Sequence, residues 1–429
     1  MGDDEGPGAR EAIRRYWPMI YAPTALYSMG VGSLVPVLPT IAGDLGATLA
    51  TAALVAAALV VGQLVGNIPA GALVAHVGER RAMIAAALVE LGGIATMLLA
   101  PGVPVLAAGA LVVGGCASVF ALARHAFMTA RVPFASRARA LALVGGSFRL
   151  GTFTGPLIAA ALIWATGSER STLWFFAACT VGVAFLVALG PDPEEKARAA
   201  ERRAARDADA EDTGEPVTGS IPADERTGLF RTIWRHRRVL SRLGLAAASL
   251  AAVRAGRQAV LPLWGLSIGL DSANTALIVG VAGAVEFSLF YASGQVMDRF
   301  GRIWATVPSQ VLMGSAFFSL AFTHELGTSA MWFGVFAVVV GVGNGLSSGA
   351  LLTLGADVAP RENTAGFLGA RRTLTDGGAA LTPLIVSALT AAASLPVATG
   401  AVGLIGLAGA VGFWRWVPRH GSRPPGALR

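Results

Sequence analysis

The sequence predicts an all-α membrane protein with twelve transmembrane helices in two halves of six. Of its 429 residues, 54% are hydrophobic, and the mean hydropathy of +0.62 is too high for a soluble globule. Apolar segments of about 18 to 27 residues, each long enough to cross about 30 Å of hydrocarbon as a helix, recur along the chain. The sequence also repeats itself, with matching glycines and prolines in its two halves.

The first six helices are expected between an N-terminal segment, residues 1–17, and a polar stretch at 191–239. Residues 1–17 run from acidic to basic without a short apolar core and a small-residue cleavage site, so no removable signal peptide is predicted. Each later helix is an apolar run bounded by charged residues or by Pro and Gly. The spans are 18–41, 49–75, 82–100, 104–129, 139–165 and 171–190, forming an N-terminal bundle over 18–190.

Residues 191–239 interrupt the hydrophobic pattern with charge, Pro and Gly, which predicts a cytoplasmic linker. From about residue 224 its apolar side chains alternate with arginines, a pattern that fits either a short helix on the membrane surface or a solvated tether. Six further helices follow, and residues 418–429 form a cytoplasmic tail. Their spans are 240–267, 273–297, 303–323, 329–356, 366–391 and 395–417, forming a C-terminal bundle over 240–417.

The formal charge of +7 first suggests a nucleic-acid partner, but the positions of the charges indicate topology instead. Most of the 33 Lys and Arg residues lie in the termini and the even-numbered connections, which places both termini in the cytoplasm. Some of this charge is expected to attract anionic lipid head groups. Lys196 is the only lysine, which suggests a GC-rich bacterial genome and therefore a bacterial plasma membrane. Cys116 and Cys179, isolated within helices, are expected to be packing residues.

The two halves repeat each other at a nearly constant offset. The "VLP" at 37–39 recurs at 260–262, and Gly71 matches Gly294 at the same spacing, which is the first offset. After a slip of four positions, "PLIAAAL" at 156–162 recurs as "PLIVSAL" at 383–389, which defines a second offset. Because six helices precede the linker and six follow it, equivalent helices run in the same direction, as a parallel repeat.

Two segments with the same glycine spacing lie at equivalent places in the halves. The second is "GQVMDRFGR" at 294–302, with Gly294, Asp298, Arg299, Gly301 and Arg302. The first is "GALVAHVGE" at 71–79, with Gly71, Gly78 and the following Arg80, but with Ala75 in place of the aspartate.

In these segments the sequence resembles the major facilitator superfamily, and the resemblance extends over residues 18–417. The signature connection of that superfamily reads roughly Gly-x-Leu-Ala-Asp-Arg-x-Gly-Arg-Arg. The "GTFTGPLIAA" at 151–160 is similar to the Gly-Pro pattern of its drug:proton antiporters, with Ala159 and Ala160 replacing a final glycine pair. An arginine that many such exporters carry four residues before a glycine is absent, because Ala110 stands before Gly114. The resemblance implies the major facilitator fold, with two six-helix bundles that work by alternating access.

The resemblance also implies that both signature segments gate the cytoplasmic end of the molecule. Asp298 is expected to face the start of the 139–165 helix, where it would interact with the positive helix N-terminus and with Arg137 or Arg139. Ala75 cannot make the matching contact in the first half. The sequence therefore predicts a latch on one side only.

Charged residues inside the expected helices are the strongest indication of function, because each opposes insertion by at least about 2.5 to 3.5 kcal/mol at a helix centre unless it is paired or hydrated. None of them is expected to face lipid. They are Glu90, Arg124, Arg149, Arg254, Arg257, Glu286 and Asp376.

The internal repeat relates four of the membrane-embedded polar residues in pairs. The first offset relates Gln63 to Glu286, and the second relates Arg149 to Asp376. In the superfamily fold the second helix packs on the eleventh and the fifth on the eighth, so the resemblance implies contacts of Gln63 with Asp376 and of Arg149 with Glu286. The depths of Arg149 and Glu286, about 15 to 17 Å from the cytoplasmic side, agree with an ion pair.

Glu286 and Asp376 are the two expected proton carriers. Protonation of Glu286 would remove most of the attraction that holds Arg149, so the pair would work as a switch at the moving interface. Asp376 would face Gln63 rather than a cation and would take up a proton to relieve desolvation. The alternatives are a permanent clamp for the pair and a hydrogen-bonded structural acid for Asp376.

In the superfamily fold, helices 1, 4, 7 and 10 line the central cavity, so residues on these helices are expected to meet substrate. Arg254 and Arg257, one turn apart, would attract a carboxylate or phosphate, or else act as countercharges to Glu286 and Glu90. Arg124 either joins the cavity or extends to the interface. The other expected cavity residues, for which helix packing is the alternative, are Asn344, Ser347 and Tyr27.

The sequence has no metal-ligand spacing, no nucleophile with a base and no phosphate-binding loop, so neither an enzyme nor a cofactor is predicted. The expected function is secondary transport, most simply proton-coupled efflux of an amphipathic or anionic small molecule by a monomer. The alternatives are uptake or facilitated diffusion of an organic anion or sugar-like metabolite and, in another class, a non-transporting membrane scaffold or sensor.

Overall fold

The computed structural model of the chain describes residues 20–131, 134–189, 237–351, 354 and 364–420. The expected linker at 191–239 lies almost wholly outside these residues, as does the surface helix considered for its last part. Most of the described residues are helical, and none of them lies in a strand. In the first half they are α2 (Ala22–Leu34), α3 (Leu38–Asp44), α4 (Leu49–Val77), α5 (Glu79–Leu98), α6 (Val103–Arg131), α7 (Phe134–Thr166) and α8 (Arg170–Leu189).

The second half has the same order of long helices. They are α11 (Arg237–Ser267), α12 (Ser272–Phe300), α13 (Arg302–Leu320), α14 (Ser329–Leu346), α16 (Thr364–Ala392) and α17 (Leu395–His420). The first expected helix is divided into α2 and α3 by a turn at 35–37. Pro36 and Pro39 explain this division, because neither can donate the backbone hydrogen bond that a continuous helix requires.

Eleven helical segments among the described residues are long and apolar enough to cross a membrane, one fewer than the twelve expected. The missing one is α11, which is 31 residues long but has Arg254, Arg257 and Gln258 near its middle. These side chains reduce its apolarity without interrupting the helix. The chain is therefore a multi-pass membrane protein in which one long helix is unusually polar.

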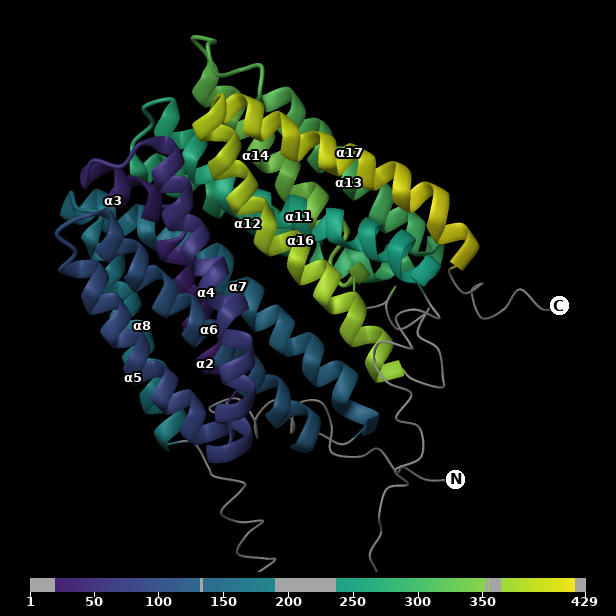
Figure 1. Cartoon of the computed structure of the whole chain (residues 1–429), viewed down its shortest axis with the longest axis horizontal. Coiled ribbons are helices and arrows are strands. Elements are labelled where there is room, and N and C mark those ends of the chain that lie inside the picture. Colours follow the sequence, from purple (N-terminus) through teal and green to yellow (C-terminus); the bar gives the residue numbers. More distant parts are fainter. Residues whose placement is uncertain (1–19, 132–133, 190–236, 352–353, 355–363, 421–429) are drawn as a thin grey trace, which may run out of the picture.

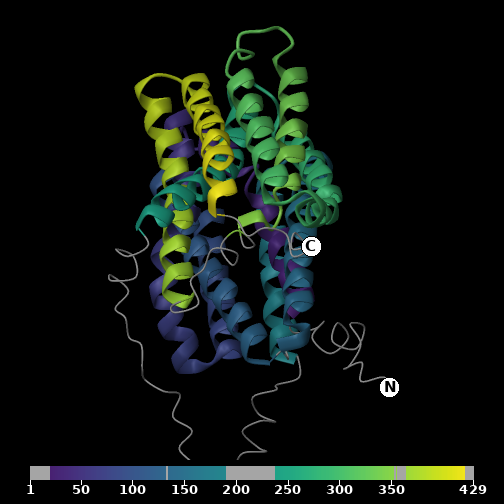
Figure 2. The same ribbon diagram turned by 90° about the vertical axis from the view of Figure 1, so that its right-hand side faces the viewer.

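The helices form two bundles that meet along two pairs of helices. In Figure 1 the first half is coloured purple to blue and the second teal to yellow, and Figure 2 shows the same halves after a 90° turn. Across the interface, α7 packs on α12 and α4 packs on α16. These are the fifth and eighth and the second and eleventh of the twelve expected helices, so the packing agrees with what the resemblance implied. In both views α16 lies beside the first half.

The internal repeat is visible in how helices pack within each half. A Cβ added at Gly114 of α6 would meet the carbonyl oxygen of Leu59 in α4, and one added at Gly341 of α14 would meet that of Ala282 in α12. The first offset of the repeat relates Leu59 to Ala282, and the second relates Gly114 to Gly341. Backbones approach this closely only where a glycine leaves space.

Further contacts join the halves at the end of the molecule where α3 lies. Ser272, at the start of α12, donates a hydrogen bond of 2.7 Å to Glu169, just before α8. Ser387 of α16 donates one of 2.9 Å to the carbonyl of Ala50 in α4. These bonds, together with the α7–α12 and α4–α16 packing, hold the two bundles against one another around a central space.

Candidate substrate cavity and charge cluster

A cavity of about 360 Å³ lies between the halves, and its walls come from α2, α4, α6, α7 and α11 together with single residues of α3, α12 and α16. This volume is within the range of small-molecule sites, and most of the wall is apolar. The polar side chains of the wall are Tyr27, Gln63, Arg124, Thr152, Arg257 and Gln258.

Glu286 of α12 lies at the centre of a charge cluster at the interface between the halves. Arg149 Nη1, from α7 of the first half, is 3.1 Å from Glu286 Oε1, so the expected pair is present. Arg257 Nη1, from α11, is 2.7 Å from the other oxygen, Oε2, a contact that the sequence raised only as an alternative. The three side chains are 12 to 21% exposed. One carboxylate is therefore shared by two guanidinium groups from opposite halves.

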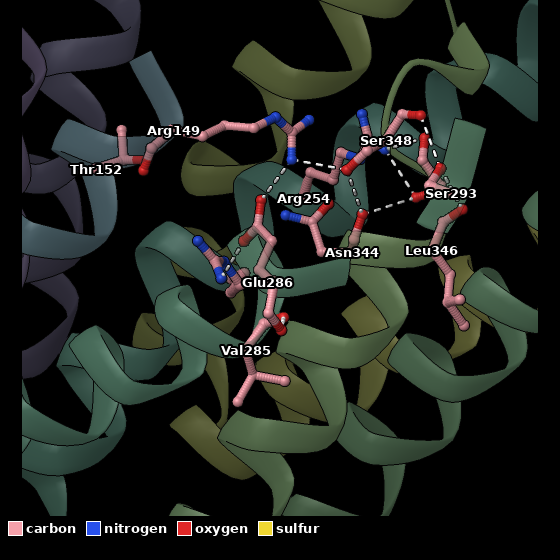
Figure 3. A network of polar contacts seen from close by, with 12 residues as sticks. Arg149, Thr152, Arg254, Val285, Glu286, Ser293, Asn344, Leu346 and Ser348 are labelled. Atoms are coloured by element: carbon pink, nitrogen blue, oxygen red, sulfur yellow. Dashed lines mark hydrogen bonds and ion pairs between the residues drawn. The ribbon is translucent and has the colours of Figure 1, made fainter. Parts of the chain in front are cut away.

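Arg149 spans the interface between the bundles (Figure 3). Its Nη1 also donates a hydrogen bond of 2.7 Å to Ser348 Oγ, and its guanidinium carbon lies 4.8 Å from the centre of the Phe290 ring. One turn further along α7, Phe153 packs on Phe287 with ring centres 5.1 Å apart. The side chain of Arg149 thus connects the first half to both α12 and the residues that follow α14.

Arg254 lies behind the cavity wall rather than in it, so of its two predicted roles the structure favours that of a countercharge to Glu286. Its Nη2 donates hydrogen bonds to the Ser347 carbonyl oxygen at 2.8 Å and to Ser347 Oγ at 2.7 Å. Ser347 and Asn344 are both buried and also lie outside the wall. The reason is geometric: residues three apart on a helix differ in direction by about 60°, so Arg257 reaches the cavity while Arg254 points into the packing against α14.

The cluster carries a surplus of positive charge. Arg254 interacts electrostatically with Arg149, Arg257 and Glu286, so three guanidinium groups share one carboxylate among the described residues. Arg124 adds another cation in the cavity wall, where its Nη1 lies 3.3 Å from Thr24 Oγ1 and its guanidinium is 5.9 Å from the Phe148 ring centre. Of the two alternatives for Arg124, the structure favours a position in the cavity.

Asp376 does not meet Gln63, and the predicted contact between them is wrong. The Asp376 side chain is 46% exposed and lies 3.5 Å from Arg372, one turn earlier on α16. Gln63 instead belongs to the cavity wall. The packing of α16 on α4 was predicted correctly, but the Asp376 side chain lies beside Arg372 of its own helix instead of reaching Gln63. Asp376 is consequently neither buried nor without a cation.

Asp376→Asn is expected to change thermal stability by less than about 0.5 kcal/mol, because exposed i,i+4 ion pairs contribute about 0.3 to 0.5 kcal/mol. The unfolding midpoint of the purified variant in detergent, followed by intrinsic fluorescence, measures this directly. Proton-driven transport should be unchanged as well. A strong loss of pH-gradient-driven flux in this variant would restore Asp376 as a proton carrier.

Glu90 of α5 does not face lipid, as expected for a charged residue within a helix. Its side chain is fully buried, and Thr180 Oγ1 of α8 donates a hydrogen bond of 3.1 Å to Glu90 Oε2. Tyr27 and Cys116 lie close enough to interact with the same carboxylate. In the sequence, Glu90 was singled out only because a charged residue within a membrane helix opposes insertion. Its proximity to the cavity residue Tyr27 was not predicted.

The two signature segments end helices in the same way. Gly78 follows α4 with φ +82°, and Gly301 follows α12 with φ +94°, a conformation that favours glycine. Gly71 and Gly294 lie within the helices themselves rather than in a connection.

The arginines of these segments bind backbone or neighbouring rings. Arg80 donates to the Ala188 carbonyl, Arg302 donates to the Met297 carbonyl at 3.3 Å, and Arg299 lies 5.4 Å from the Phe300 ring centre. The side chains of Asp298, Arg137 and Arg139, on which the one-sided latch depends, lie outside the described residues.

Within the described ranges, no three His, Cys, Asp or Glu side chains come together as metal ligands would.

The sequence model of the Major Facilitator Superfamily matches residues 22–380. A comparison with curated protein sequences gives no match.

Several solved structures are similar in fold. A D-xylose-proton symporter is 13% identical, with a TM-score of 0.67 over 93% of this chain and 97% of the other. The xylose transporter XylE from E. coli, in a partially occluded inward-open conformation, is also 13% identical, with a TM-score of 0.64 over 94% and 100%. A POT family transporter in complex with a thioalcohol-conjugated peptide is 12% identical, with a TM-score of 0.69 over 93% and 95%.

Proposed function

Because the chain belongs to the major facilitator superfamily and is a membrane transporter rather than an enzyme, we propose that it moves a small anionic molecule by alternating access, coupled to protons. It would work as a monomer in a bacterial plasma membrane with both termini in the cytoplasm. Family membership sets the scaffold or sensor alternative aside. The cavity between the halves is the proposed substrate site.

The surplus of positive charge at the cavity is the observation that carries this proposal. Three guanidinium groups share the Glu286 carboxylate, and Arg257 is both a member of that cluster and part of the cavity wall. Arg124 faces the same cavity from α6. A carboxylate or phosphate entering the cavity would find hydrogen-bond donors and positive charge, and the described residues of the wall include no carboxylate that would repel it.

Glu286 is the residue with which a substrate anion would compete. Its carboxylate binds Arg149 with one oxygen and Arg257 with the other. An anion that binds Arg257 would weaken the hold of α11 on Glu286 and change the balance of charge around Arg149. Since Arg149 joins the halves, substrate binding would be transmitted to the interface that must rearrange during transport.

The direction of transport has two candidates with different support. The "GTFTGPLIAA" pattern in α7 resembles drug:proton antiporters and supports efflux. The named structural neighbours include a D-xylose-proton symporter, which supports uptake of an anion or a sugar-like metabolite. Flux measured in proteoliposomes with an imposed pH gradient of either sign separates the two, because an antiporter and a symporter respond to that gradient in opposite directions.

The anion preference is tested with matched ligands that differ in one charged group. Glucuronate against glucose, and benzoate against benzyl alcohol, are added to the purified chain in a thermal-shift experiment. We expect at least one anion to stabilise the chain, by about 2.7 kcal/mol at a hundred times its Kd, while its neutral partner does not.

Arg257→Gln should remove most of that stabilisation, whereas Arg372→Gln, whose parent side chain is 73% exposed, should leave it intact. Equal effects of the neutral and charged members of both pairs would contradict the proposal. So would an unchanged response of Arg257→Gln to the stabilising anion.

A further inference from the structure

Glu90 is a buried acid that the charge cluster at the interface does not use. Its side chain has no exposed surface, and Oε1 has no hydrogen-bond partner in the structure. The opposite oxygen, Oε2, accepts the 3.1 Å hydrogen bond from Thr180. Among the described residues Glu90 has no ion-pair partner, which distinguishes it from Glu286 and from Asp376.

The groups that surround Glu90 come from three other helices. Thr180 of α8, Tyr27 of α2 and Cys116 of α6 are the polar and titratable side chains that interact with it. Arg124 of α6 interacts with Tyr27. Tyr27 and Cys116 belong to a buried hydrophobic cluster that also includes Ala86 and Ala87 of α5.

An ionised Glu90 would therefore be a charge in an apolar environment without a counter-charge, which is among the most unfavourable arrangements in a membrane protein. A proton on the carboxyl group removes that charge and supplies a donor for hydrogen bonding. By contrast, two arginines hold Glu286 as a carboxylate, and Asp376 is exposed beside Arg372.

Tyr27 connects this acid with the cavity. Its side chain forms part of the cavity wall, its ring lies 4.6 Å from that of Phe120, and its hydroxyl is buried beside Glu90. A hydroxyl group accepts and donates at the same time, so it can pass a proton on without a lasting change in its own charge.

We propose that Glu90 is the proton-binding site of the transport cycle and that Tyr27 passes the proton between Glu90 and the cavity. In uptake of a proton, the Tyr27 O–H bond breaks as a new O–H bond forms on the Glu90 carboxylate, and the tyrosine oxygen takes a proton from a hydronium ion in the cavity, which leaves as water. Tyr27 ends unchanged and Glu90 ends neutral. The coupling role rests on the proposed function, while proton binding at Glu90 is independent of it.

Proton binding is tested without any substrate by infrared difference spectroscopy of the full chain in lipid as the pH is changed. We expect a carbonyl-stretch band of a protonated carboxylic acid that titrates in the wild type and is missing in Glu90→Gln. Asp376→Asn is the matched control and should keep the band. If Glu90→Gln keeps every titrating carboxylic-acid band of the wild type, the proposal is wrong.

Two further variants make the test independent of how well Glu90→Gln folds. Thr180→Val keeps the acid but removes its hydrogen-bond donor, so the band should persist at a shifted frequency. Tyr27→Phe should keep the band while protonation becomes slower after a pH jump. A band that neither variant alters does not belong to Glu90 and contradicts the proposal.

Coupling is tested in proteoliposomes with radiolabelled glucuronate and benzoate. For whichever of these the wild type moves, Glu90→Gln should lose accumulation driven by a pH gradient at least about tenfold, yet keep exchange without a gradient within about threefold. Wild-type accumulation retained in Glu90→Gln overturns the coupling role. If the wild type moves neither anion, the proposed function is weakened, and the infrared experiment still decides whether Glu90 binds a proton.

Discussion

Glu286→Gln is expected to lower the free energy of unfolding by about 3 to 5 kcal/mol, because it removes one member of a buried ionic network and leaves the other charges uncompensated. Here the loss concerns three guanidinium groups at once, since Arg149 and Arg257 bind the carboxylate directly and Arg254 interacts with it. The thermal unfolding midpoint of the purified variant measures the effect.

A double variant separates the effect of the lost charge on stability from the effect of the changed side-chain shape. Adding Arg257→Gln to Glu286→Gln removes one of the uncompensated cations, so the double variant should be more stable than Glu286→Gln alone. An anion that binds the cavity should also rescue Glu286→Gln more strongly than it stabilises the wild type. If Glu286→Gln unfolds at the wild-type midpoint, the carboxylate is not what holds the three arginines together.

The same variant bears on the proton-switch hypothesis for Glu286. That hypothesis rested on one arginine partner, whereas the structure provides two, at 3.1 Å and 2.7 Å. The second guanidinium group, that of Arg257, belongs to the cavity wall, so it is the cation for which an anion in the cavity would compete. If Glu286→Gln retains full proton-coupled transport, Glu286 carries no proton in the cycle.

Gly62→Ala is expected to destabilise the first half by about 1 to 3 kcal/mol or more, through overpacking between α4 and α6. A Cβ at this position would meet the carbonyl oxygen of Leu111 and lie 2.9 Å from its carbonyl carbon. Backbone atoms cannot move aside as the end of a flexible side chain can, so the two helices would have to separate. Gly62 is not part of the cavity wall, so the substitution tests packing rather than substrate contact.

Gly92→Ala, in the neighbouring helix α5, is the matched control because nothing lies within 4 Å of a Cβ added there. It should be neutral or stabilise the chain by up to about 1 kcal/mol, since alanine favours a helix over glycine. Unfolding midpoints of the two variants are compared in the same detergent. Equal midpoints would mean that the close approach of α4 and α6 is not required for stability.

The fold could be predicted from the sequence because the features that define it do not depend on the direction of each side chain. Apolar length defines the helices, and the two offsets of the internal repeat relate the halves. Together with the family resemblance, they placed α7 against α12 and identified the Arg149–Glu286 contact. The similar depth of the two residues in the membrane was enough to predict this ion pair, because both side chains are long and the two helices are in contact.

The rest of the site depends on the rotation of each helix about its axis, which this sequence does not define well. Helices that are apolar or small-residue on all sides have no clear inward face. Arg254 and Arg257 were therefore treated as equivalent, and the pairing of Asp376 with Arg372 of its own helix was not predicted. Glu90 was recognised as a charge within a helix, but its interaction with Tyr27 was not predicted, since it depends on the direction in which α5 turns this side chain.

The low apolarity of α11 has a consequence for how the protein is made. As the ribosome delivers this helix to the insertion machinery, Arg254 and Arg257 each oppose its entry into lipid by about 2.5 to 3.5 kcal/mol. The compensating carboxylate is Glu286, which emerges later because it lies on the next helix, α12. Helix α11 would then remain beside the translocation channel until α12 arrives, and the two would enter the bilayer as a hairpin. Loss of Glu286 would consequently reduce the amount of protein inserted during synthesis, in addition to weakening the finished molecule.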